Sequence, residues 1–249
     1  MFRTAFFIFA NMNKVLIIGA TTGIGRELAK QYAQKGWAVG ATGRRIEHLE
    51  SLKATFPGQI YIKHHDVSDQ NSLTKIGELA IEMGGFEVFI YNSGYGQFNR
   101  ELDFVIEKTT IDVNVTGFTE CIGWAYRYFK NQGFGTLVGI SSVASQRGGF
   151  RAPAYNASKA FMSNYLQGIS AKAHKENRKI EVVDIRPGYV LTPMTERNPS
   201  MFWVAPVEKA AQQIISAIQR KSPVAYITKR WWLMAFIMRN LPAWMAKGI

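Results

Sequence analysis

The chain has 249 residues, 47% of them hydrophobic, which suits one large α/β domain with a sizeable core rather than two independent domains. Its net charge of +12 favours an anionic partner (a nucleic acid, a membrane surface or a phosphate-rich ligand) unless it serves only solubility. A single cysteine, Cys121, and four histidines without metal-ligand spacing exclude a disulfide framework, predict no metal site and suit a reducing, cytoplasmic compartment.

Short apolar runs alternate with helical patterns along the chain. Strands are predicted at residues 14–19, 37–42, 60–65, 86–91, 135–141, 180–185 and 224–227. Helices are predicted at residues 23–35, at 46–52, from a cap at Ser68 to about residue 83, over most of 102–129, from Pro153 to about 175, and from Pro206 to 218. Apolar strands that alternate with helices predict a doubly wound, Rossmann-like α/β fold with seven parallel strands and helices on both faces.

The two ends of the chain differ from this pattern. Residues 1–12 are either an apolar N-terminal extension or the result of a start assigned too early, and residues 13–228 are predicted to form a single catalytic domain. Residues 229–249 are basic and rich in tryptophan, and no acidic residue follows Glu208. This C-terminal segment suits a helix lying on a membrane surface, a subunit contact or a lid over the substrate.

A glycine-rich turn links the first predicted strand to the first helix. Its sequence, Gly19-Ala20-Thr21-Thr22-Gly23-Ile24-Gly25, has the spacing G-x-x-x-G-x-G. Glycines allow a close approach of backbone to phosphate, and the helix that starts there offers free N–H groups to a pyrophosphate. A glycine-rich turn alone is a weak signal, but its position between strand and helix indicates a dinucleotide site.

Two arginines, Arg44 and Arg45, follow the second predicted strand. An acidic residue here would bind the ribose 2′-hydroxyl of NAD, and none is present. Guanidinium groups suit a 2′-phosphate, so the sequence favours NADP over NAD as the cofactor. The alternative is that both arginines only begin a solvated helix.

Tyr155 and Lys159 stand four residues apart on a predicted helix, downstream of Ser142. Positions i and i+4 share one helix face, so the Lys159 ammonium is predicted to lower the pKa of Tyr155 toward the working range. Ser142 could then hold a substrate oxygen beside the phenol. The spacing Tyr-x-x-x-Lys is also common on ordinary helices, so it does not establish a catalytic site by itself.

Several motifs occur together in one order. They are Gly19-x-x-x-Gly23-Ile24-Gly25, Tyr91-Asn92-Ser93-Gly94, Asn114, Ser142, Tyr155-x-x-x-Lys159 and Pro187-Gly188-Tyr189-Val190-x-Thr192. In this combination the chain resembles the short-chain dehydrogenases/reductases over about residues 13–227. The resemblance implies an NAD(P)-dependent oxidoreductase that forms a homo-oligomer, either a dimer or a tetramer.

The resemblance also implies a role for each matching residue. Ser142 would bind the substrate oxygen, and Tyr155 would be the general acid in reduction and the base in oxidation. Lys159 would lower the tyrosine pKa and hold the nicotinamide ribose, and Asn114 would organise a water that relays protons from Lys159. Asp66 and Val67 would contact adenine. The full cofactor-binding set would be Gly19, Thr21, Thr22, Gly23, Ile24, Gly25, Arg44, Arg45, Asp66, Val67, Asn92, Ser93, Gly94, Tyr155, Lys159, Pro187, Gly188, Val190 and Thr192.

Three features depart from the usual family pattern. The family often has Asn-Asn-Ala-Gly where this chain has Tyr91-Asn92-Ser93-Gly94, and often threonine where Ile18 stands, and these changes affect only detail. Thr22 stands where some NADP-preferring members carry a basic residue, which counts against NADP.

The predicted reaction is the reduction of a ketone or aldehyde with NADPH. Residues 189–205 would form the substrate lid by resemblance, and their methionine and aromatic side chains suit a lipophilic carbonyl or alcohol substrate. The alternative, which the sequence supports equally well, is that these side chains only pack on the hydrophobic core.

Two other classes of function remain as alternatives. The first is a non-catalytic dinucleotide sensor or scaffold on the same fold, against which the presence of all four catalytic residues argues. The second is a nucleic-acid-binding protein, which the charge of +12 permits but for which the chain offers no recognition motif. Attachment to a membrane surface through the C-terminal segment is a further hypothesis.

Overall fold

The structure is a computed structural model that describes residues 13–196 and 201–242. The predictions made for residues 1–12 lie outside the described residues, as do Trp244 and Lys247 of the C-terminal segment. In the described part of the chain, no helix is long and apolar enough to cross a membrane.

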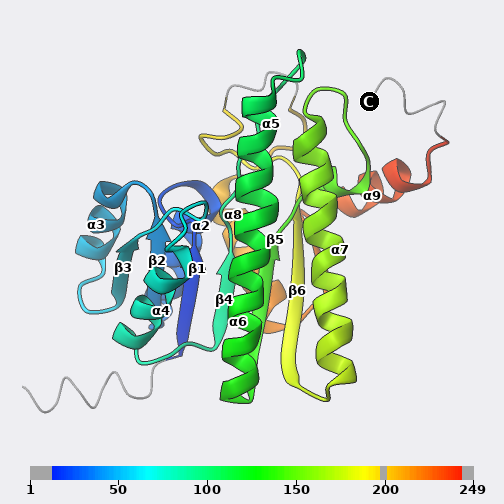
Figure 1. The fold of residues 1–249 in the computed structure, drawn as a ribbon. Coiled ribbons are helices and arrows are strands. Elements are labelled where there is room, and N and C mark those ends of the chain that lie inside the picture. Colours follow the sequence, from blue (N-terminus) through cyan, green and yellow to red (C-terminus); the bar gives the residue numbers. More distant parts are fainter. Residues whose placement is uncertain (1–12, 197–200, 243–249) are drawn as a thin grey trace, which may run out of the picture.

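A parallel sheet forms the centre of the molecule (Figure 1). Its strands are β1 (Lys14–Ile18), β2 (Ala38–Gly43), β3 (Ile60–His64), β4 (Val88–Tyr91), β5 (Phe134–Ile140), β6 (Lys179–Pro187) and β7 (Val224–Ile227). The order across the seven-stranded sheet is β3-β2-β1-β4-β5-β6-β7, and every pair is parallel. The predicted doubly wound fold is therefore confirmed, and the strand order reverses between β1 and β4. In such sheets a ligand binds beyond the carboxyl ends of the strands at this reversal.

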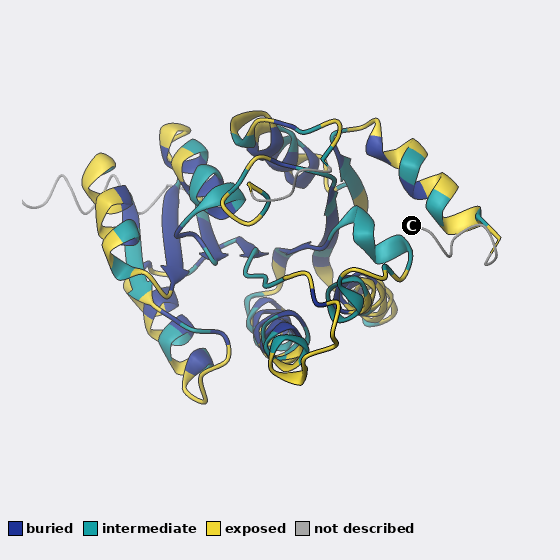
Figure 2. Ribbon diagram, turned by 90° about the horizontal axis from the view of Figure 1, so that it is seen from above, coloured by how far each residue is buried: buried dark blue, intermediate teal, exposed yellow. Residues whose placement is uncertain are grey.

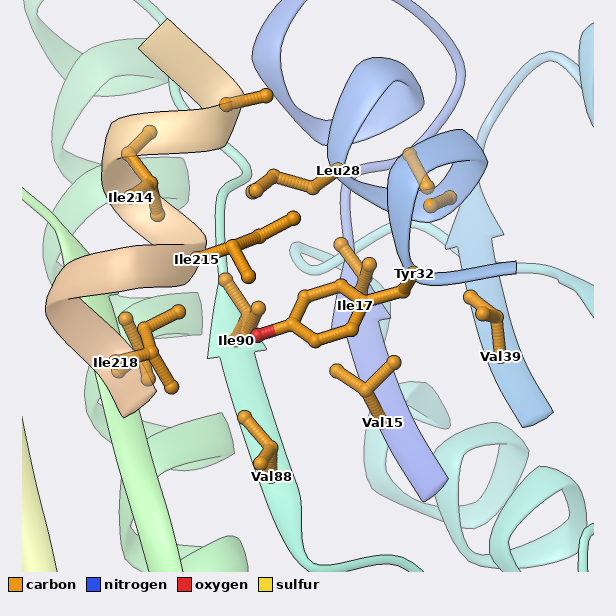
Figure 3. Packing of buried hydrophobic residues seen from close by; sticks show 14 of the residues in the cluster. Val15, Ile17, Leu28, Tyr32, Val39, Val88, Ile90, Ile214, Ile215 and Ile218 are labelled. Atoms are coloured by element: carbon orange, nitrogen blue, oxygen red, sulfur yellow. The ribbon is translucent and has the colours of Figure 1, made fainter. Parts of the chain in front are cut away.

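Helices cover both faces of the sheet (Figure 2). The α-helices of the described residues are α2 (Gly23–Gln34), α3 (Ile46–Thr55), α4 (Ser72–Glu82), α5 (Phe104–Ile111), α6 (Phe118–Gln132), α7 (Pro153–Lys175), α8 (Val207–Gln219) and α9 (Trp231–Asn240), and α9 projects away from the sheet. Alternate residues of a strand point to opposite faces, so each strand contributes to two cores. Val15 and Ile17 of β1 pack toward α2, α3 and α8, whereas Leu16 and Ile18 pack toward α4, α6 and α7. Figure 3 shows Tyr32 of α2 in the first core, between β1, β4 and α8.

Two helix predictions need correction. The helix predicted to begin at Ser68 begins at Ser72, because the Ser68 hydroxyl and backbone N–H both donate to the Asp66 carboxylate and close a local turn. The helix predicted over residues 102–129 begins after Asp103, whose side chain accepts from the Val105 N–H at 2.8 Å. That helix also contains a π-helical segment at Asp112–Gly117, which separates α5 from α6.

Candidate active site

The glycine-rich turn joins β1 to α2, and the backbone there requires glycine. Gly19 and Gly23 have φ values of +87° and +57°, in the left-handed region that favours glycine. A Cβ on Gly25 would collide with the Gly19 carbonyl oxygen, and one on Gly19 would lie 2.6 Å from the Ser93 Oγ. The turn therefore runs close against the chain after β4, and its backbone forms one wall of the cleft.

Asn92 fixes this turn from the neighbouring strand. Its Nδ2 donates to the Gly19 carbonyl at 2.7 Å, and its backbone N–H donates to the Ile18 carbonyl at 2.9 Å. Ser93 N also donates to Ile18 at 2.9 Å. Asn92 and Ser93 thus hold β1 and β4 together at the reversal point while lining the cleft.

Both arginines after β2 lie at the same end of the cleft. Arg45 donates to the hydroxyls of Thr21 and Thr22, at 3.0 and 2.9 Å. Arg44 lies 3.9 Å from the Asp66 carboxylate, and its side chain is 68% exposed. Burial raises the pKa of Asp66, but the hydrogen bonds from Ser68 and the charge of Arg44 outweigh it, so the pKa is lowered and the carboxylate stays ionised.

Ser142, Tyr155 and Lys159 meet at the other end of the cleft. Ser142 follows β5, and its Oγ accepts from Ala144 N–H at 3.1 Å and lies 3.4 Å from the Pro187 carbonyl. Tyr155 and Lys159 project from one face of α7, with the Lys159 Nζ 5.7 Å from the centre of the Tyr155 ring. The Lys159 Nζ donates to the Ile140 carbonyl at 3.0 Å, so the end of β5 holds the ammonium in place.

The electrostatics of this group differ from the prediction. Burial raises the pKa of Tyr155, while a hydrogen bond with Ser142 opposes the rise. Burial also lowers the pKa of Lys159 to about 8, although the Asp184 carboxylate favours its charged form. The predicted lowering of the Tyr155 pKa is therefore not seen in this structure, because burial of the phenol itself raises that pKa.

Asn114 lies in the π-helical segment and is fully buried. Its Oδ1 accepts from the Tyr95 N–H at 2.9 Å, while its Nδ2 donates to the Tyr95 carbonyl at 2.8 Å and to the Ser158 hydroxyl at 2.9 Å. These bonds fix the segment that follows Gly94. A Cβ on Gly94 would lie 3.5 Å from the Lys159 Nζ and 3.7 Å from the Asn114 Oδ1, so both side chains flank this glycine.

The segment after β6 closes the cleft. Val190 pairs with Ala205, and the Thr195 hydroxyl donates to the Val190 carbonyl at 2.6 Å. A Cβ on Gly23 would lie 3.2 Å from the Thr192 methyl, so this segment reaches across to the glycine-rich turn.

One cleft of about 250 Å³ brings nearly all the predicted residues together. Its lining includes Gly19, Thr21, Thr22, Gly23, Ile24, Arg44, Arg45, Asp66, Val67, Asn92, Ser93, Gly94, Ser142, Tyr155, Lys159, Pro187, Gly188, Val190 and Thr192. Gly25 and Asn114 do not line it and act from behind its wall. Within the described residues, no cluster of metal-ligating side chains is present.

Two further residues shape the catalytic end and were not identified from the sequence. Gly96 lies against Tyr155, since a Cβ there would come within 2.8 Å of the ring's Cε2. Trp231 packs so closely on Gly188 that a Cβ on this glycine would overlap the indole ring. Gly96 stands two residues after Gly94 of the Asn92–Gly94 motif, which is a usable signal. Nothing in the sequence pairs Trp231 with Gly188.

Comparison with known proteins agrees with this arrangement. The protein-family model for short chain dehydrogenases matches residues 13–202. An uncharacterized oxidoreductase of Mycobacterium tuberculosis is 32% identical over 236 residues, which cover 91% of each chain. The chain belongs to the short-chain dehydrogenase/reductase family. It is thus an NAD(P)-dependent oxidoreductase, and the predicted family resemblance is confirmed.

Solved structures share the fold of this short-chain dehydrogenase. A short-chain dehydrogenase from Sphingobium yanoikuyae in complex with NADPH has a TM-score of 0.79 at 21% identity, covering 93% of this chain and 97% of that one. A 3-ketoacyl-(acyl-carrier-protein) reductase from Brucella melitensis complexed with NADH has a TM-score of 0.78 at 19% identity, covering 86% and 95%.

Proposed function

We propose that this short-chain dehydrogenase reduces a lipophilic ketone or aldehyde with NADPH. The observation that carries the proposal is one cleft with two chemically different ends. Backbone amides and two arginines lie at one end, and Ser142, Tyr155 and Lys159 lie at the other. A dinucleotide that spans the cleft would bring its nicotinamide beside the phenol of Tyr155.

The chain's residues fit such a cofactor. The glycine-rich turn leaves backbone where side chains would block an approaching phosphate, and α2 starts there with its N–H groups free for an anion. Arg45 with Thr21 and Thr22, and the exposed Arg44, offer donors for a 2′-phosphate. Asp66 lies near Arg44 but does not replace the acidic residue that would bind a ribose 2′-hydroxyl directly after β2. These features favour NADPH over NADH.

The proton would come from Tyr155. Burial raises its pKa, so at neutral pH the phenol keeps the proton that the reduction consumes. NADPH, when bound, would supply the hydride for the carbonyl carbon and be oxidised to NADP⁺. Tyr155 would donate its proton to the carbonyl oxygen, which would give the alcohol. Ser142, which lines the same end of the cleft as Tyr155, would hold that oxygen during the transfer.

Lys159 and Asn114 would support this step without touching the substrate. The ammonium of Lys159 lies beside the Tyr155 ring, where it would bind the nicotinamide ribose and stabilise the phenolate left after transfer. Both polar atoms of the Asn114 side chain form hydrogen bonds with Tyr95 and Ser158. We therefore assign Asn114 a positioning role, in which it fixes the segment of the cleft wall beside Lys159. A water relay through this residue would have to use its backbone.

The substrate end favours an apolar ligand. Met194 lines the cleft and is exposed, and Phe202 and Trp203 lie exposed in the same segment. Family membership supports a homo-oligomer, and the lone thiol supports a cytoplasmic location. Burial raises the pKa of the Cys121 thiol to about 12, so this cysteine is inert.

The test is turnover of NADPH with a panel of hydrophobic ketones and aldehydes, with NADH assayed in parallel. Tyr155→Phe should lower kcat by about 100- to 10,000-fold, because it removes the general acid. Its NADPH affinity, measured by calorimetry, should stay close to that of the parent. Tyr165→Phe is the matched control, since Tyr165 lies on the same helix but packs against Phe118.

Two results would contradict the proposal. Binding of NADPH without turnover that depends on Tyr155 would favour a dinucleotide sensor on this fold. Equal kcat/KM values for NADH and NADPH would refute the assignment of the arginines.

A further inference from the structure

The C-terminal helix α9 is fixed to the catalytic domain at both ends. At its start, Trp231 is buried beneath Tyr189, Phe202 and Trp203, with ring centroids 5.5, 5.1 and 5.9 Å from its own. At its end, Arg147 donates to the carbonyls of Met238 and Leu241, at 2.9 and 2.5 Å. These contacts determine which face of α9 turns outward.

The outward face of α9 is apolar. Trp232, Leu233, Phe236 and Ile237 are 58%, 49%, 56% and 41% exposed. Their spacing places them on one side of the helix, opposite the buried Trp231. The rings of Trp232 and Phe236 stack with centroids 5.9 Å apart. A helix on a water-exposed surface normally turns a polar face outward, so this apolar face marks an interaction surface.

Cations lie at both ends of this face. Lys229 and Arg230 are exposed just before α9, and Arg239 is exposed in its last turn. The Arg230 guanidinium lies 5.4 Å from the centre of the Trp203 ring. No aspartate or glutamate follows Glu208 in the sequence, so this segment has no acidic side chain of its own to pair with these charges.

We propose that the outward face of α9 docks on a bilayer that contains anionic phospholipid. Tryptophan and phenylalanine would enter the boundary between headgroups and acyl chains, with the cations at the anionic headgroups. Each lysine or arginine near such a surface contributes about 1 kcal/mol to the free energy of membrane binding. The docking does not depend on the reaction that the cleft performs.

A second copy of the chain fits this face less well. A two-fold contact would set the face against itself, so Lys229, Arg230 and Arg239 would meet like charges across the interface. The segment has no acidic residue that could relieve this repulsion. An anionic surface complements the same charges.

Docking through α9 would bring the substrate end of the cleft near the bilayer. Trp231 packs on Gly188, which lines the cleft, and the exposed Phe202 packs on Trp231. If the proposed lipophilic substrate is correct, it would then enter from the membrane.

The experiment is flotation of the full chain with vesicles. We expect binding to phosphatidylcholine vesicles that contain phosphatidylglycerol, little binding to pure phosphatidylcholine, and weaker binding at high salt. The double variant Trp232→Glu/Phe236→Glu should reduce the bound fraction at least about tenfold. Ile81→Glu/Val105→Glu is the control, since it adds the same charge at two exposed apolar positions on α4 and α5 and should bind as the parent does.

A second measurement does not rely on the folding of that variant. Brominated phosphatidylglycerol vesicles should quench the tryptophan emission of the parent, and Trp232→Phe should lose part of this quenching. Equal flotation of both double variants, or no binding of the parent to anionic vesicles, would overturn the proposal. So would a parent dimer that dissociates on Trp232→Glu/Phe236→Glu, which would assign the face to a second copy.

Discussion

The two ends of the cleft are built differently. At the nucleotide end, backbone that only glycine allows lies beside two exposed arginines, of which Arg45 is held by hydrogen bonds to Thr21 and Thr22. At the catalytic end, the half-buried Ser142 after β5 meets Tyr155 and Lys159 of α7, and Lys159 is only 5% exposed. The nucleotide end owes its form to the backbone conformation of the glycine-rich turn. The catalytic end instead holds the Lys159 ammonium where water solvates it poorly.

Because of this difference, we expect substitutions at the two ends to change different properties, either cofactor binding or folding stability. Substitutions at the nucleotide arginines should alter affinity and selectivity with little effect on folding. A buried ammonium costs folding free energy, so its removal should stabilise the protein while abolishing activity.

The largest expected effect is that of Lys159→Met. Turnover should fall at least about 100-fold, because the ammonium no longer supports Tyr155 and the ribose. The folded protein without cofactor should gain on the order of 3 kcal/mol at pH 7, since each pKa unit corresponds to about 1.4 kcal/mol. Urea unfolding and steady-state kinetics measure the two effects.

The pH dependence of unfolding tests whether the gain in stability comes from removing the buried Lys159 ammonium. The folded-state pKa of Lys159 is lowered to about 8 from 10.5, so between these values the unfolded chain binds more protons than the folded one. The contribution of Lys159 to stability therefore rises with pH across this window. Lys159→Met should lack this rise, and an identical pH profile in both proteins would refute the assignment.

A smaller effect is expected at the nucleotide end. Arg44→Ala and Arg45→Ala should each raise the KM for NADPH about 10- to 100-fold, because a charge-assisted hydrogen bond contributes about 1.5–3 kcal/mol. The KM for NADH should change little, since it carries no 2′-phosphate. Arg127→Ala, at an exposed position on α6, is the control. A parallel loss for both cofactors would mean that the arginines hold the fold and do not select the phosphate.

The smallest effect concerns the turn itself. Gly25→Ala should lower the free energy of unfolding by about 1–3 kcal/mol, because its Cβ would press on the Gly19 carbonyl. Gly168→Ala should instead raise it by about 0.5–1 kcal/mol, because Gly168 lies in α7 with open space around it. Thermal unfolding compares both with the parent, and a stable Gly25→Ala protein would show that the turn can relax.

The sequence predicted the strands and most of the residues that line the cleft, although it missed others such as His65, Tyr95 and Ser141. Apolar runs define buried parallel strands, and glycine at 19 and 23 reports a backbone requirement directly. The pKa of Tyr155 could not be predicted in the same way. Its direction depends on how deeply the chain buries both the phenol and the nearby lysine. The i, i+4 spacing contains no information on burial.

Contacts between residues far apart in the chain could not be predicted from the sequence either. The contact of Trp231 with Gly188 joins segments that are distant in the chain, and only the folded sheet brings them together. The π-helical segment at Asp112–Gly117 is another case, since the Asn114 bonds to Tyr95 and Ser158 depend on tertiary structure.

That π-helical segment sets the rotational phase of α6. Each residue in a helix turns the chain by roughly 100°, so the extra residue of a π turn determines which side of α6 meets the sheet. Phe118, Cys121 and Phe129 are fully buried in the present phase. Deleting one residue from Asp112–Gly117 would restore regular winding and rotate these side chains away from the core. The length of this segment is therefore as constrained as its sequence.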